Sequence, residues 1–177
     1  MTTGHVFIAT SLDGFIARPD GGLDWLQDAN AAGEDHGYDA FIASVDGIFM
    51  GRETFRVSLG FDPWPYSKPL IVLSTGFRKG DLPAHLADQV SIARSVPEAL
   101  SESGRRGWRR AYVDGGATIR SFLRKGAVQD MVITRIPVLL GAGLPLFGPL
   151  PEDIALRHQG TRSFPSGLVQ SRYEVIA

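Results

Sequence analysis

The chain has 177 residues, of which 44 % are hydrophobic and 21 % charged, and its formal net charge is −1. Such a balance is typical of a globular domain and gives no bulk attraction to nucleic acid or to a membrane surface. The absence of cysteine excludes disulfides, thiolate catalysis and a zinc–cysteine deaminase site.

The sequence shows no internal repeat, linker or low-complexity tract, so we expect a single domain over residues 1–177. It shows neither a signal peptide nor a run of about 20 apolar residues, and we therefore expect a cytoplasmic protein without a membrane span. The four histidines have no metal-ligand spacing, so no metal site is predicted.

Short apolar runs alternate with helical patterns along most of the chain. The runs predict buried strands at residues 5–9, 47–50, 69–73, 89–93, 112–113 and 128–140. Apolar spacing or an S-x-x-E capping motif predicts helices around residues 38–45, 95–100 and 119–123, and residues 53–59, after the Gly51-Arg52 junction, are expected to form a short helix.

Two extended runs close the sequence, over residues 154–164 and 168–176, around Pro165-Ser166-Gly167. This arrangement predicts a C-terminal antiparallel hairpin. Together with the alternating strands and helices, it predicts an α/β fold with three layers: a mostly parallel central sheet with helices on both faces.

Three of the predicted strands end in small or polar residues: Gly51-Arg52, Ser74-Thr75 and Gly115-Gly116. Ligands of open α/β sheets bind beyond the carboxyl ends of the strands. A helix start favours a pyrophosphate, and an arginine side chain favours a further phosphate. One such junction alone is an ordinary turn, but the three together indicate an NADP site.

The sequence also resembles a known family through five motifs that occur in the family's order. They are Ser11–Ala17 (SLDGFIA), Met50–Phe55 (MGRETF), Val72–Ser74 (VLS), Val113–Ala117 (VDGGA) and Leu139–Phe147 (LLGAGLPLF). The chain is similar to the dihydrofolate reductase superfamily, and within it to stand-alone relatives of the reductase domain of the bifunctional riboflavin-biosynthesis deaminase-reductase. The resemblance implies a dihydrofolate reductase-like fold and NADPH as the cofactor.

The resemblance also implies roles for cofactor-binding residues. The backbone of Ala9 would hold the nicotinamide carboxamide, and Ile16 would cover the nicotinamide ring. The phosphates and the 2′-phosphate end would be bound by Gly51, Arg52, Thr54, Ser74, Thr75, Gly115, Gly116, Ala117 and Thr118.

The substrate side is less defined by the sequence. Folate reductases place a carboxylate early in the helix after the first loop, and Asp35 and Asp39 lie in or before the matching helix here. Either is a candidate catalytic acid or a solvated surface acid. Asp13 either shapes the S-L-D-G loop or faces the substrate, and Trp25 either stacks on a planar ring or is a buried anchor.

One feature departs from the riboflavin reductases, which carry basic residues on the substrate-side helix. This chain has the acids Glu34, Asp35 and Asp39 there, and these would repel a ribose phosphate unless Arg135 or Arg18 compensates. We therefore predict an NADPH-dependent reductase of a small, pterin- or aminopyrimidine-like heterocycle, with the phosphoribosylaminouracil reductase as the alternative.

Two non-catalytic alternatives stay open: an NADPH-binding protein without turnover, and an interaction module built on the same fold. The terminal hairpin resembles the edge through which the riboflavin reductases pair, which favours a homodimer through the C-terminal strands. No nucleic-acid partner is expected, because the basic cluster Arg105–Arg110 fits a solvated loop.

Overall fold

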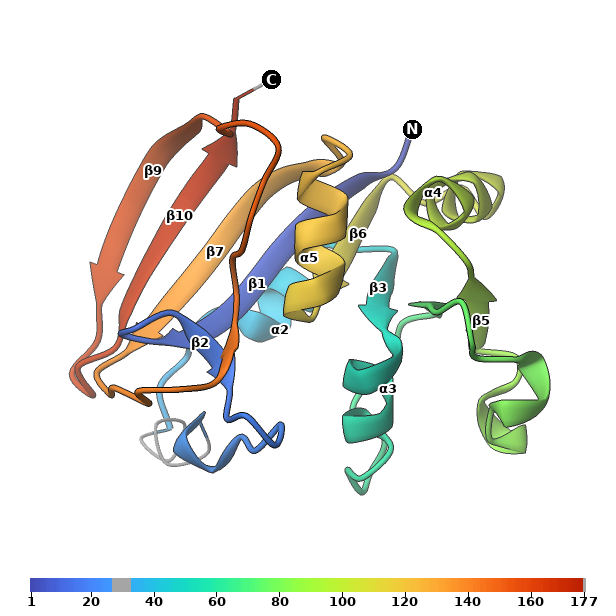
Figure 1. Cartoon of the computed structure of the whole chain (residues 1–177), viewed down its shortest axis with the longest axis horizontal. Helices are drawn as coiled ribbons and strands as arrows, with labels where there is room; N and C mark the ends of the chain where they lie inside the picture. The colour runs from blue at the N-terminus through green and yellow to red at the C-terminus, as the bar shows by residue number, and fades with distance from the viewer. Residues whose placement is uncertain (27–32, 177) are drawn as a thin grey trace.

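The computed structural model describes residues 1–26 and 33–176 and has one large sheet at its centre (Figure 1). The eight strands lie in the order β5-β4-β3-β6-β1-β7-β10-β9. They are β1 (Thr3–Ser11), β3 (Gly47–Gly51), β4 (Leu70–Leu73), β5 (Val90–Ala93), β6 (Arg110–Asp114), β7 (Val128–Ile136), β9 (Leu156–Ser163) and β10 (Val169–Val175).

The six strands from β5 to β7 are parallel, and β10 and β9 extend the sheet in antiparallel pairing. Their hairpin turns at Pro165-Ser166-Gly167, as the sequence predicts. The α/β fold with a mostly parallel sheet and a terminal antiparallel hairpin is thus confirmed.

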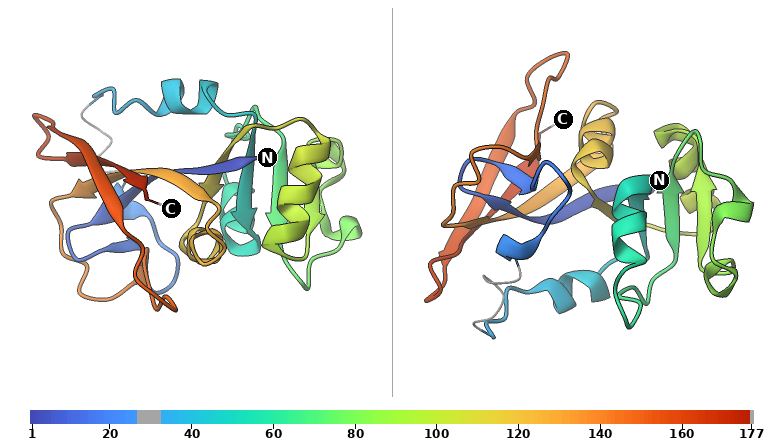
Figure 2. Two further views of the ribbon diagram at one scale, coloured as in Figure 1. Left: turned by 90° about the horizontal axis from the view of Figure 1, so that it is seen from above. Right: turned by 60° about the horizontal axis from the view of Figure 1, so that its bottom comes forward.

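Helices lie on both faces of this sheet. They are α2 (Tyr38–Ala43), α3 (Arg52–Ser58), α4 (Val96–Arg105) and α5 (Gly116–Leu123), with short 3₁₀ turns η1 (Lys79–Asp81) and η2 (Ala84–Leu86). Seen from above, α2 lies on one face and α4 and α5 on the other (Figure 2). In the described residues, none of the helices has the length and apolar character that crossing a membrane requires.

The alternation of side chains along each strand builds two cores. In β3, Phe49 points to the cluster under α4 and α5, while its neighbours Ile48 and Met50 point to the cluster on the α2 side. All three side chains are fully buried. A strand buried on both faces reads as a continuous apolar run, which is why residues 47–50 were predictable as a strand.

The capping motif before α4 is used in a modified form. The Ser95 side chain accepts a hydrogen bond from the Glu98 amide at 3.3 Å, but the Glu98 carboxylate binds the amide of Arg94, not that of Ser95. The helix start is therefore where the motif predicts it.

A second, two-stranded sheet was not predicted from the sequence. It pairs β2 (Phe15–Ala17) with β8 (Leu144–Pro145) in antiparallel fashion. These strands are only three and two residues long, too short to show a period-2 pattern. They bring the S-L-D-G loop and the glycine-rich loop of residues 141–148 together in front of the main sheet.

Candidate functional site

A cavity lies beyond the carboxyl ends of the central parallel strands. β4, β3 and β6 are adjacent in the sheet, and Met50 of β3 pairs with Asp114 of β6. The three junctions that follow these strands therefore meet at one edge. They border a cavity of about 1040 Å³.

Every residue that the sequence analysis assigned to the cofactor lines this cavity. They are Ala9, Ile16, Gly51, Arg52, Thr54, Ser74, Thr75, Gly115, Gly116, Ala117 and Thr118. The residues come from β1, β2 and the junctions after β3, β4 and β6, so the fold brings together segments that are far apart in the sequence.

The starts of α3 and α5 pack closely because two of the junction residues are glycine. Gly115 has a φ of 84°, and a Cβ there would lie 2.3 Å from the Thr54 hydroxyl oxygen. A Cβ at Gly51 would lie 3.0 Å from the hydroxyl oxygen of Thr118. A side chain at position 115 would thus separate the two helix starts, whose first amides have no partner within their own helices.

A turn of residues 74–77 forms a further part of the cavity rim. The Ser74 hydroxyl accepts a hydrogen bond from the amide of Phe77 at 3.0 Å. The guanidinium of Arg94 donates to the carbonyl oxygens of Ser74 and Thr75 at 2.8 and 3.1 Å. Arg52 lies against the same turn, since a Cβ on Gly76 would be 3.7 Å from its guanidinium nitrogen. No motif in the sequence pointed to Arg94 as the residue that holds this turn.

The small sheet closes the opposite side of the cavity. A Cβ on Gly116 would lie 3.0 Å from both the Ile16 side chain and the Pro145 carbonyl oxygen. Arg120 of α5 donates to the carbonyls of Pro145 and Leu146 at 2.6 and 3.1 Å. Ile16 is therefore held against the start of α5 by β8 and Arg120.

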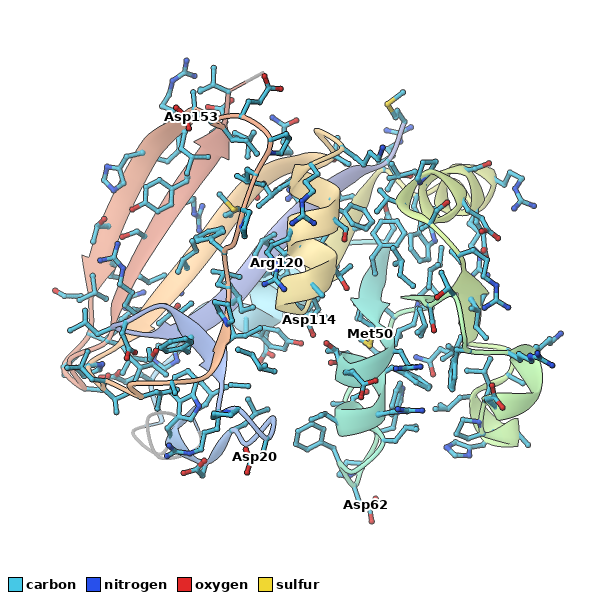
Figure 3. All side chains as sticks on the ribbon, viewed as in Figure 1. Asp20, Met50, Asp62, Asp114, Arg120 and Asp153 are labelled. Carbon is cyan, nitrogen blue, oxygen red and sulfur yellow. The ribbon has the colours of Figure 1, made fainter. Side chains whose placement is uncertain are left out.

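A carboxyl group that the sequence analysis did not select lies at the cavity: Asp114, the last residue of β6 (Figure 3). Burial raises the pKa of this carboxyl, and hydrogen bonds from Tyr112, Tyr66 and the Gly115 amide oppose the rise only in part. Tyr38 also lines the cavity, and burial raises its pKa to about 12. Asp114 belongs to the V-D-G-G-A motif, so the sequence placed it at the end of a strand beside the predicted cofactor site. Only the glycines and the alanine of this motif were assigned a role from the sequence.

Asp13 does not line the cavity and instead organises two loops. Its carboxylate accepts hydrogen bonds from the Ser11 hydroxyl at 2.6 Å and from the amides of Leu140 and Gly141 at 3.2 and 2.8 Å. These bonds hold the pKa of Asp13 below its usual value, with the Ser11 bond as the largest cause. Of the two predicted alternatives, the geometry matches the loop-shaping one.

The other predicted acids also lie outside the cavity lining. The exposed Asp35 accepts a hydrogen bond from the amide of Gly37 at 2.7 Å and thereby forms the turn before α2. Asp39 is exposed in the first turn of α2, where a negative charge suits the helix dipole. Both therefore match the alternative of solvated surface acids.

The predicted substrate residues Trp25 and Arg135 do not line the cavity either. Trp25 is buried in a cluster with Ile136, Phe164 and Leu168, which matches the buried-anchor alternative. Arg135 is exposed on β7, and Arg18 forms an ion pair with Asp24 at 2.7 Å. Among residues 1–26 and 33–176, no cluster of three or more His, Asp or Glu could hold a metal ion.

Comparisons with known proteins show the family to which the chain belongs. Residues 3–170 match the family described as the RibD C-terminal domain. The protein YwjB of Bacillus subtilis is 35 % identical over 162 residues, which cover 90 % of each chain.

Solved structures of riboflavin-biosynthesis proteins are also similar to this chain. A crystal structure from Shewanella sp. PV-4, provisionally described as a riboflavin biosynthesis protein, is 38 % identical with a TM-score of 0.92 and covers 99 % of this chain and 100 % of its own. The deaminase/5-amino-6-(5-phosphoribosylamino)uracil reductase of Thermotoga maritima has a TM-score of 0.69 at 13 % identity, and the match covers 99 % of this chain and 57 % of that one. The second likeness concerns the fold alone.

Proposed function

Since the chain belongs to the RibD C-terminal domain family, we propose that it is an NADPH-dependent reductase that transfers a hydride to a small heterocyclic substrate. The observation that carries this proposal is the continuous cavity of about 1040 Å³, which extends from the three strand-end junctions to the half-buried carboxyl of Asp114. This volume lies at the upper end of the roughly 300–1,000 Å³ that is usual for small-molecule and cofactor sites.

The residues present fit the cofactor. Gly115 and Gly116 leave the start of α5 without side chains that would keep a pyrophosphate away from its amides. Arg52 is 42 % exposed at the cavity and pairs with the surface carboxylate of Glu53, so its guanidinium is available to the 2′-phosphate. Ile16 and Ala9 would flank the nicotinamide.

NADPH, when bound, supplies the hydride, and reduction of a C=N or C=C bond then needs one proton to balance the charge. We assign delivery of that proton to Asp114, because burial raises its pKa and favours the protonated carboxyl. The chain otherwise orients the two reactants and excludes water from the reacting atoms.

The experiment that tests the cofactor assignment is a titration of the purified protein with NADPH and with NADH, followed by calorimetry. We expect tighter binding of NADPH. Arg52→Ala should weaken NADPH binding by about 1–3 kcal/mol and leave NADH binding nearly unchanged, because only the 2′-phosphate forms the charged hydrogen bond.

Arg56→Ala is the matched control. Arg56 lies on the same helix and also pairs with Glu53, at 3.3 Å, but does not line the cavity. Equal losses for both nucleotides in Arg52→Ala would remove the role of Arg52, and failure of both nucleotides to bind the wild-type protein would refute the reductase proposal.

A second candidate function is the 5-amino-6-(5-phosphoribosylamino)uracil reductase of riboflavin biosynthesis, which the family match favours. A non-catalytic NADPH-binding protein is the third. Oxidation of NADPH with the phosphoribosylated pyrimidine would establish the second, whereas tight NADPH binding without turnover of any heterocycle would favour the third. We also propose a homodimer through β9 and β10, since β9 is an exposed edge strand of the sheet.

A further inference from the structure

The part of the cavity away from the proposed cofactor residues has mostly apolar walls, and we call it the substrate half. It is bordered by the loop after β2, α3 with its following loop, β7 and the terminal hairpin. Its apolar walls include Leu23, Leu26, Val57, Phe61, Ile136 and Leu168.

Two of these side chains are unusually exposed for their size. Val57 is 45 % and Phe61 46 % exposed, although both border the cavity. Val57 lies in the last turn of α3 and Phe61 in the loop that follows it. The loop after β2, which carries Leu23 and Leu26, projects beyond the sheet on the other side of the site (Figure 1). An apolar ligand group between the two walls would remove this surface from water.

The charges around the cavity do not suit an anion in the substrate half. Among the described lining residues, the Lys and Arg side chains are Arg52, at the cofactor junction, and Arg120. The Arg120 guanidinium is already bound to the carbonyls of Pro145 and Leu146. The lining also contains the carboxyl group of Glu53. Those of Asp20 and Asp114 border the cavity as well (Figure 3). Residues 27–32, outside the described ranges, have no Lys or Arg in their sequence.

His36 is the remaining side chain of the lining that could become cationic. Its Nε2 lies 3.3 Å from the carboxylate of Glu34, which the Ser166 amide also binds at 3.0 Å. Hydrogen bonds from Ser166 hold the pKa of Glu34 below its usual value, so Glu34 stays ionised. A protonated His36 would therefore be neutralised by Glu34 and would offer little attraction to a phosphate.

We propose that the substrate is an uncharged planar heterocycle that carries an apolar substituent and no phosphate. Its ring lies beside Asp114. Its substituent lies between two walls, one formed by Leu23 and Leu26 and the other by Val57 and Phe61. This inference rests on the proposed reductase function, because it assigns the other half of the cavity to NADPH. The proposed substrate differs from a phosphoribosylated pyrimidine in lacking the phosphate. A phosphate dianion in the substrate half would lose its hydration without gaining a contact to an unpaired cation of the described lining.

The test compares two aminopyrimidinones that carry a benzyl group, one of them with a phosphate ester on the phenyl ring. Each is titrated calorimetrically into the protein saturated with NADPH. We expect the unphosphorylated compound to bind at least about tenfold more tightly. Equal or tighter binding of the phosphate ester, or no binding of either compound, overturns the inference. The NADPH titration made beforehand reports separately on the proposed function.

A substitution in the apolar wall tests whether the substituent of the ligand contacts Phe61 directly. Phe61→Arg introduces a cation at the cavity mouth and should improve binding of the phosphate ester by roughly tenfold while weakening the unphosphorylated compound. Leu59→Arg is the matched control: Leu59 is 39 % exposed at the end of the same helix but does not line the cavity, and its substitution should leave the preference unchanged. The same shift in both variants would contradict a direct contact at Phe61.

Discussion

Asp114 is the residue whose surroundings best explain how this site could supply a proton. It ends β6, and its carboxyl lies among the tyrosines Tyr112 and Tyr66 at the cavity wall. Burial has the largest influence on this carboxyl and favours its protonated form, and the hydrogen bonds from Tyr112, Tyr66 and the Gly115 amide oppose this only in part. The site can thus hold the neutral carboxyl that the low-polarity surroundings favour.

Asp114→Asn should lower the turnover of NADPH by about 10²–10⁴-fold, because the amide has the shape of the acid but no transferable proton. NADPH affinity should change little, since the proposed phosphate contacts lie elsewhere. Because the pKa of Asp114 is raised, wild-type turnover should be highest below that pKa and should fall as the pH rises through it. Steady-state NADPH oxidation across a pH series measures both effects.

Asp20→Asn is the control for this substitution, as Asp20 also lines the cavity but is exposed. Its substitution should preserve the fall of turnover with rising pH. If Asp114→Asn keeps wild-type turnover with the same pH profile, another group delivers the proton.

At single positions, the sequence predicted the lining of the cavity best where a backbone requirement determines the residue. Gly115 and Gly51 are glycines at strand–helix junctions, and such junctions meet at one edge of any parallel sheet. The spacing of residues along the sequence does not determine in which direction a side chain in a loop points. Asp35 and Asp39 have a suitable i, i+4 spacing, yet α2 begins only at Tyr38 and Asp35 turns back to the amide of Gly37.

The pairing of the short strands β2 and β8 depends on side chains outside them. The Asp13 carboxylate connects the turn before β2 with the amides of Leu140 and Gly141 in the segment before β8. In turn, the Ser11 hydroxyl accepts a hydrogen bond from the amide of Phe15 at 3.0 Å. The S-L-D-G motif was readable from the sequence as a turn, but its partner segment lies more than 120 residues away.

Asp13→Asn should lower the stability of the protein at pH 7, because an amide replaces one of the carboxylate oxygens that accept hydrogen bonds. The folded-state pKa of Asp13 is depressed, so its stabilising contribution is present above the unfolded pKa near 3.8 and is lost as the pH falls through the lower folded pKa. Urea unfolding at pH 7 and at about pH 3 should therefore show a larger difference between variant and wild type at pH 7.

Asp153→Asn, at an exposed position before β9, tests whether the change of charge alone has this effect. We expect it to leave the midpoint of unfolding unchanged at both pH values. A pH-independent loss in Asp13→Asn would mean that shape, and not the ionised carboxylate, holds the two loops together.

For the molecule as a whole, the order of elements predicted the sheet well because parallel strands need long crossover connections. The helices α3, α4 and α5 provide such connections beside β3, β5 and β6, and the sequence showed a capping motif for α4 and an apolar spacing for α5. The order in which the strands lie side by side in the sheet could not be predicted from the order of elements along the chain. β1 lies between β6 and β7, which is a long-range pairing that local patterns do not encode.

The free edge of the sheet leads to the last prediction, the oligomeric state. β9 is paired only with β10, and nearly all its side chains are exposed. Unpaired edge strands are usually protected or used for association. We expect light scattering to show a dimer of the 19.2 kDa chain. Leu156→Lys, at the 44 % exposed first residue of β9, should raise the dimer dissociation constant by roughly tenfold, about 1.4 kcal/mol.

Leu139→Lys makes the same chemical change outside the hairpin, at a leucine that is 69 % exposed. If the dimer forms through β9 and β10, only the substitution at Leu156 should shift the dissociation curve, because a charge in the interface lies close to its symmetry copy while a charge elsewhere is screened by solvent. Dissociation caused by Leu139→Lys alone would place the interface on the loops around β8, and a wild-type monomer at micromolar concentration would refute the dimer.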